Sequence, residues 1–116
     1  MFASAQTIKT PDGESLFTIN GNAIYSERSK IVTGFFDHNM IRNINAFKIG
    51  RIHNDSIYNY RNDLLAIYKN DTLFMHSGYI NSIIKGNKIY THNMILMGTF
   101  ENIDPDRIKL LLFFNL

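Results

Sequence analysis

The chemistry that this sequence could support depends first on three of its four histidines. His38, His76 and His92 each stand two residues after an aromatic residue. If hairpins carrying them were arranged around an axis, the three side chains would occupy related positions, and neutral imidazoles brought together can bind a metal such as zinc. Carboxylate ligands at matched positions are lacking, and equivalent positions around a ring can lie too far apart for one coordination sphere. We therefore predict no metal site and keep the three histidines as candidate binding residues.

Catalytic motifs are absent from the sequence. His76 and Ser77 are adjacent, but Ser77 belongs to a predicted turn, where serine is a common turn residue. There is no G-x-S-x-G elbow, no H-E-x-x-H helix and no glycine-rich phosphate loop. No pair of carboxylates stands out for acid–base chemistry either. We therefore predict that the protein is not an enzyme and has no cofactor.

The tyrosines and phenylalanines, fifteen in total, offer a different chemistry. Aromatic side chains on a surface can stack against sugars or contact a peptide. Four tyrosines lie outside the repeated aromatic position described below, and these are the better candidates for a surface: Tyr25, Tyr60, Tyr68 and Tyr79. Of these four, we select Tyr60 and Tyr79 as candidate binding residues.

The elements that must position these side chains form a repeat. An apolar residue followed by an aromatic one occurs three times at a spacing of sixteen residues, and we call each such pair an anchor: Ile57-Tyr58, Leu73-Phe74 and Ile89-Tyr90. Leu16-Phe17 and Phe35-Phe36 resemble these anchors at looser spacing, with an insertion expected around residues 40–45. The aromatic members of the anchors, Phe17, Phe36, Tyr58, Phe74 and Tyr90, are predicted to lie in the core.

Turn signals follow the anchors. Three and four residues after each anchor stand the predicted two-residue hairpin turns: Asn20-Gly21, Asn39-Met40, Arg61-Asn62, Ser77-Gly78 and Asn93-Met94. Small residues come eight positions after the last three anchors, at Ala66, Ser82 and Gly98, with large apolar residues two further on. Polar strings such as Lys69-Asn70-Asp71 are predicted to connect successive hairpins. These strings also include two glycosylation sequons, which we interpret as turns.

This pattern predicts an all-β domain of about five repeated antiparallel hairpins, forming one compact sheet or barrel. A single hairpin is marginal in water, so the units must pack together. We assign residues 1–14 to an N-terminal tail, 15–102 to the repeat and 103–116 to an apolar segment packed on it. Within that segment, Asp104-Pro105 is typical of a helix start, and 107–114 is predicted to be a short buried helix. A final β-strand is the alternative.

The repeat resembles the bacterial family described as four-fold beta-flower proteins. The stretches that carry the resemblance are 56–71, 72–87 and 88–102, and Ile49-Gly50-Arg51-Ile52 adds a family-like strand. The resemblance covers about residues 15–102. It implies a bacterial source and a compact arrangement of hairpins, and it implies no particular activity.

Composition and charge narrow the choice of partners. The 116 residues are 45% hydrophobic, contain no cysteine and carry a net charge of +2. Disulfides, thiolate catalysis and cysteine-ligated metals are thereby excluded, and no apolar run approaches the length of a transmembrane helix. Because the lysines and arginines are scattered, we predict no nucleic-acid partner. Exposed hairpin edges favour self-association into a homo-oligomer.

The N-terminus suggests export. Ala3-Ser4-Ala5 has the small-x-small pattern that precedes signal-peptidase cleavage, so residues 1–5 are a possible remnant of a signal peptide. We expect a protein exported to the periplasm, the cell surface or the medium, with the cytoplasm as the alternative. The leading hypothesis is a non-catalytic binding or structural module. The alternatives are an accessory or inhibitor subunit that docks to a partner protein through its apolar C-terminus, and a small histidine-dependent hydrolase or metal-binding protein.

Overall fold

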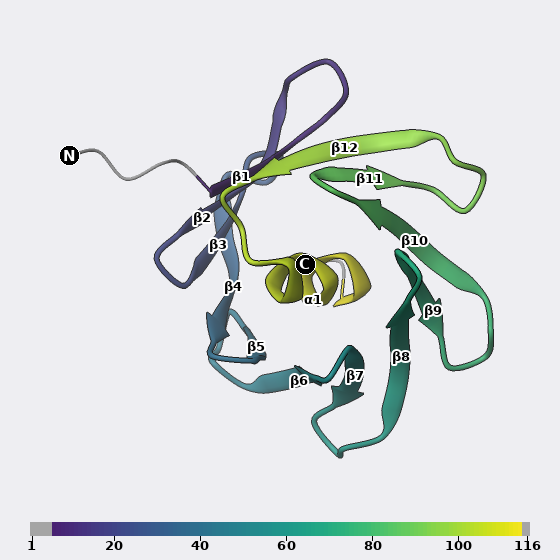
Figure 1. Cartoon of the computed structure of the whole chain (residues 1–116). Helices are drawn as coiled ribbons and strands as arrows, with labels where there is room; N and C mark the ends of the chain where they lie inside the picture. The colour runs from purple at the N-terminus through teal and green to yellow at the C-terminus, as the bar shows by residue number, and fades with distance from the viewer. Residues whose placement is uncertain (1–5, 115–116) are drawn as a thin grey trace.

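The protein is a closed antiparallel β-barrel around a helix (Figure 1). The computed structural model describes residues 6–114. Its strands are β1 (Gln6–Lys9), β2 (Ser15–Asn20), β3 (Ala23–Ser26), β4 (Ile31–Asp37), β5 (Met40–Asn43), β6 (Lys48–His53), β7 (Ser56–Asn59), β8 (Leu64–Lys69), β9 (Thr72–Met75), β10 (Ile80–Lys85), β11 (Lys88–Tyr90) and β12 (Leu96–Glu101), and its helix is α1 (Pro105–Phe114). Each strand pairs with its neighbours in sequence, and β1 closes the ring against β12. The predicted all-β fold, with one short C-terminal helix, is confirmed.

Six copies of one strand pair build the barrel. In each copy the register shifts directly after a buried aliphatic residue on the first strand: Ile8, Ile24, Ile41, Ile57, Leu73 and Ile89. The spacing of these residues is sixteen, with one step of seventeen. The second strand holds one extra residue at the shift, a β-bulge, at Leu16, Thr33, Ile49, Leu65, Asn81 and Met97.

The structure corrects the assignment of the first two units. Phe17 and Phe36 lie on second strands, β2 and β4. Of the expected insertion, residues 40–43 form β5 and residues 44–45 belong to the loop that follows it. The sequence also placed 6–9 in a tail, whereas these residues form β1 and complete the barrel. There are therefore six units rather than about five. The proposed signal remnant, residues 1–5, lies outside the described residues.

Three of the tight turns lie where the sequence predicted connections between hairpins, and the first two overlap the predicted hairpin turns Asn20-Gly21 and Asn39-Met40. Two-residue turns occur at 21–22, 38–39, 54–55, 70–71 and 86–87. Asn54, Asp55, Asn70 and Asp71 all have positive φ, the type I′ conformation that Asn and Asp tolerate. The predicted two-residue turns at 61–62, 77–78 and 93–94 belong to longer connections, and Met40 lies in β5. In an antiparallel barrel these two kinds of connection lie at opposite ends.

We call the two ends of the barrel the tight-turn end and the wide-loop end. The wide loops are residues 10–14, 27–30, 44–47, 60–63, 76–79 and 91–95. In several of them one side chain organises the loop: the Asn59 Oδ1 accepts hydrogen bonds from the backbone nitrogens of Arg61 and Asp63, and Thr91 Oγ1 accepts equivalent bonds from Asn93 and Ile95. The loops are therefore built to a common plan.

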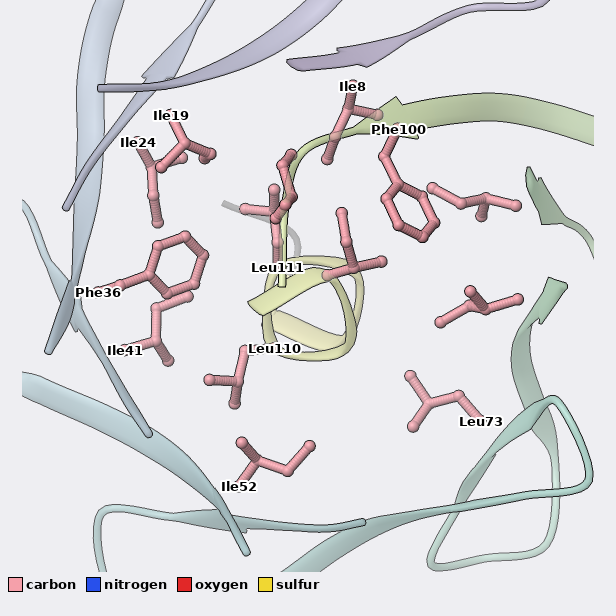
Figure 2. Close-up of a cluster of buried hydrophobic side chains, with 14 of the residues drawn as sticks. Ile8, Ile19, Ile24, Phe36, Ile41, Ile52, Leu73, Phe100, Leu110 and Leu111 are labelled. Carbon is pink, nitrogen blue, oxygen red and sulfur yellow. The ribbon is translucent and has the colours of Figure 1, made fainter. Parts of the chain in front are cut away.

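The core lies between the inner face of the barrel and α1 (Figure 2). A barrel of twelve strands is too wide for its own side chains to fill, since about eight strands already reach that limit. The helix occupies the space, with Ile108, Leu110 and Leu111 at most 3% exposed. Ile24, Ile41 and Ile52 point toward it from the wall. The aromatic anchors Tyr58, Phe74 and Tyr90 are only half-buried, because they alternate with inward residues and face outward; only Phe17 and Phe36 among the predicted core aromatics face the core.

Polar contacts fix the start of the helix at the tight-turn end. The Asp104 Oδ1 accepts a hydrogen bond from the Asp106 backbone nitrogen at 2.8 Å, which is the predicted N-cap. Arg107 donates to the Gly21 carbonyl and to Asn22 Oδ1. These contacts tie α1 to the turn between β2 and β3 and set the depth at which it enters the barrel.

Candidate functional site

A cavity of about 840 Å³ opens inside the barrel toward the wide-loop end. One wall comes from β1, β2 and β3, the other from β10, β11 and β12, and the last residues of α1 form its floor. Eight of its lining residues are large and apolar: Ile8, Leu16, Phe17, Ile89, Met97, Leu111, Leu112 and Phe113. The cavity therefore offers a concave apolar surface of the size typical of small-molecule sites.

The cavity exists because α1 lies off-centre. Its closest approach to a strand is to β6, which stands opposite β12 in the ring. At that contact Gly50 leaves room for the Phe114 ring, which an added Cβ would strike. Leaning toward β6 moves the helix away from β12 and β1, and the space left behind is the cavity.

The β-bulges contribute to the cavity lining. Three of its residues, Leu16, Asn81 and Met97, are the extra residues of their bulges. A bulge turns its extra side chain out of the regular alternation, so these side chains reach the barrel mouth. On the same side Gly98 allows β1 to come close, because a Cβ there would strike the Lys9 carbonyl oxygen. Bulge and glycine together shape this wall.

Few polar groups line the cavity, and one of them is charged. Ser26 and Ser82 are buried, and the Ser82 hydroxyl donates to Asn81 Oδ1 at 3.1 Å. Thr10 and Arg28 lie in the wide loops at the mouth. Arg28 is exposed and is the single charged residue among those that line the cavity within 6–114.

Exposed apolar side chains surround the same end of the molecule. The wide loops and their flanks carry Ile31, Ile44, Phe47, Tyr60, Tyr79, Met94 and Ile95, each at least half exposed. The tight turns carry none: their ten residues are Gly, Asn, Asp and His. The two ends of the barrel therefore differ in chemistry, and the apolar one is the end at which the cavity opens.

A smaller polar cleft of about 280 Å³ lies at the tight-turn end, between His38, Asn39 and the first turn of α1. His38 shares a hydrogen bond with Asp37 at 3.0 Å, and the Arg42 guanidinium contacts the other oxygen of that carboxylate. These two contacts, His38 first, hold the pKa of Asp37 below its ordinary value. His38 is exposed, Asp37 is half-buried and the two are already paired, so we assign them no further role.

The structure separates the predicted site residues. Tyr60, His76 and Tyr79 lie in adjacent wide loops, and His92 lies in the next one along the ring. His38 lies at the opposite end, in a tight turn. Across residues 6–114, no three side chains among His, Asp and Glu come together in a way that could hold a metal ion. Tyr68, considered for the surface, instead donates from inside the wall to the Ile84 carbonyl.

Sequence reasoning did not find Arg28 or the cavity. Arg28 belongs to a short polar stretch without a motif, and its position at the mouth depends on β3 and β10 meeting the same cavity from opposite walls. The bulge residues do recur at the sixteen-residue spacing, so they carried a signal. Their common spacing becomes visible when the six units are aligned on the buried aliphatic residue of the first strand and not on the aromatic residue.

Comparisons with protein-family models, with curated proteins and with solved structures found no match. Within the described range, no helix has the length and apolar character needed to cross a membrane.

Proposed function

We propose that this protein is a non-catalytic binding protein that holds an apolar small molecule in the cavity at its wide-loop end. The observation that carries the proposal is the cavity itself, whose lining joins eight large apolar residues to two buried serines and a few polar groups at the mouth. Binding sites for small molecules have this composition and volume. The exposed apolar side chains around the mouth give such a ligand a surface of low polarity on its way in.

The cellular setting belongs to the same proposal. A carrier or receptor of apolar molecules is useful where these molecules enter or leave a cell, which agrees with the export suggested by Ala3-Ser4-Ala5. A bacterial, exported protein remains our expectation. Self-association was expected from open hairpin edges, but every strand in the described part of the chain is paired on both sides. A homo-oligomer would have to form through side chains, and the wide-loop end is the surface for it.

The alternatives rest on weaker support. Docking to a partner through the apolar C-terminus would require α1 to leave the barrel, because Ile108, Leu110 and Leu111 are buried inside it. A histidine-dependent hydrolase would need a nucleophile and an orienting carboxylate beside His76 or His92. The hydroxyls adjacent in sequence are Ser77, which is exposed in its loop, and Thr91, whose Oγ1 already accepts two backbone hydrogen bonds.

The proposal is tested with N-phenyl-1-naphthylamine, a neutral probe whose fluorescence rises in apolar surroundings. We expect saturable binding at one site per chain. Ser82→Met extends a longer side chain into the cavity from a position 2% exposed and should weaken binding at least tenfold. Ser77→Met makes the same exchange on an exposed loop and should bind as the parent protein does.

A second variant guards against misfolding of the first. Met97→Trp narrows the mouth at a residue 44% exposed, where a larger side chain does not disturb the core. Circular dichroism establishes that each variant is folded. Failure of the parent protein to bind the probe, or equal binding by both cavity variants, would overturn the proposal.

A further inference from the structure

Arg28 differs from the other arginines in having no partner among residues 6–114. Of the five arginines, Arg42 pairs with Asp37, Arg51 bonds Asn62, Arg61 stacks on Tyr60 and Arg107 bonds the β2–β3 turn. Within residues 6–114, the Arg28 guanidinium makes no ion pair, hydrogen bond or ring contact. A guanidinium presents five donors in a fixed fork suited to carboxylate or phosphate. At Arg28 that capacity is unused.

The neighbouring carboxylate is held away from Arg28. Glu27 accepts a hydrogen bond from the Thr18 hydroxyl at 2.9 Å and forms an ion pair with Lys30 at 3.7 Å. Thr18 alternates along β2 with the inward residues Phe17 and Ile19, so it places Glu27 on the outer face of the barrel. The cavity lining itself contains no acidic residue. Among residues 6–114, no carboxylate therefore forms an ion pair with the guanidinium at the mouth.

We infer that the cavity takes an amphiphile with an anionic head, its apolar chain directed toward Leu111 and Phe113 and its head bound by Arg28 at the mouth. Asn81 and Thr10 line the same opening and offer further hydrogen bonds to the head. The inference rests on the proposed function and adds the class of ligand. Carboxylate and phosphate heads share this chemistry, so the experiment includes both.

The expected selectivity follows from the exposure of Arg28. A hydrogen-bonded charge pair at a partly exposed mouth should favour an anionic head over a neutral one of equal chain length by about tenfold. Chain length acts separately, because each methylene buried in the cavity should tighten binding by roughly fourfold. Selectivity for the head and affinity for the chain can therefore be measured independently.

The experiment measures displacement of N-phenyl-1-naphthylamine by dodecanoate, dodecyl phosphate and dodecanol, each below its micelle concentration. With the parent protein, one or both anions should bind about tenfold more tightly than dodecanol. Arg28→Gln should remove that preference while leaving dodecanol binding unchanged, and Arg28→Lys should retain most of it. Arg61→Gln, in another wide loop outside the cavity, is the matched control and should behave as the parent does.

The outcomes separate the inference from the function on which it rests. Equal binding of dodecanol and both anions by the parent protein, or an unchanged preference in Arg28→Gln, would overturn the role of Arg28 and leave the cavity as a binding site. Absence of probe binding altogether would overturn the proposed function. Retention of the preference in Arg61→Gln together with its loss in Arg28→Gln supports the inference, because both exchanges remove one charge from the same end of the barrel.

Discussion

One buried ammonium group, that of Lys109, links α1 to the barrel wall. Lys109 has a side chain only 8% exposed, and its Nζ lies 2.9 Å from Asp55 Oδ1 and 3.5 Å from Asp106 Oδ1. The same nitrogen lies 3.9 Å from the centre of the Tyr68 ring. Asp55 belongs to the tight turn between β6 and β7. We predict that removing the carboxylate of Asp55 destabilises the protein more than removing the charge of Lys109.

The magnitudes follow from what each substitution leaves behind. Asp55→Asn preserves the shape of the side chain and tolerates the φ of 63° at this turn, but it leaves a buried ammonium with only the more distant Asp106. Because Asp55 is itself half exposed, we expect a loss of about 1–2 kcal/mol of unfolding free energy. Lys109→Met keeps the length of the side chain and removes the charge, so we expect a change within about 1 kcal/mol. The double variant should match Lys109→Met.

Urea unfolding followed by far-ultraviolet circular dichroism measures these differences, since the chain has no tryptophan. Asp71→Asn is the matched control: Asp71 has the same place and the same φ in the next tight turn, without an ion pair to Lys109. An equal loss from Asp71→Asn would show that the turn, not the ion pair, is responsible. A Lys109→Met protein less stable than Asp55→Asn would refute the reasoning, because the buried charge would then be net stabilising.

Two further predictions concern the contact between α1 and β6 and the pH dependence of the unfolding free energy. Gly50→Ala should lower the unfolding free energy by about 1–3 kcal/mol in the same urea assay, because its Cβ would strike the Phe114 ring and lie 2.7 Å from the Tyr58 carbonyl oxygen; unchanged stability would mean that the helix does not lean on β6. Burial, followed by the charge of Asp71, raises the pKa of Tyr68 above its ordinary 10.0. The folded state therefore keeps this proton longer than the unfolded state, so this contribution to stability is full below pH 10 and is lost as the pH rises through the raised pKa. Between pH 9 and pH 11 the unfolding free energy should fall more in the parent protein than in Tyr68→Phe. An equal fall in the two proteins would contradict this prediction.

The sequence was sufficient for the fold class because several signals agreed over its second half. Three anchors at a constant spacing, polar strings between them and a capping aspartate before a proline predicted strands, turns and the helix. The first two units were misplaced for a physical reason. The aromatic position faces outward, so other residues serve equally well there, and the corresponding positions of two units hold Lys9 and Arg42. Ile24-Tyr25 does fit the anchor pattern, but so do Leu16-Phe17 and Phe35-Phe36 on either side of it. The inward position faces α1 and is aliphatic in all six units.

Sequence patterns did not predict the candidate site, because the site is a cavity and not a sequence motif. Closure of the ring joins β1 to β12 across most of the chain, and no local pattern predicts that pairing. The cavity then depends on where a helix settles inside a barrel that its own side chains cannot fill, and the helix settles toward Gly50. Histidines and carboxylates therefore do not indicate where such a cavity lies. In a barrel with a helix inside, the position of the void follows from which wall the helix touches, and the charge at its mouth then indicates which ligand could fill it.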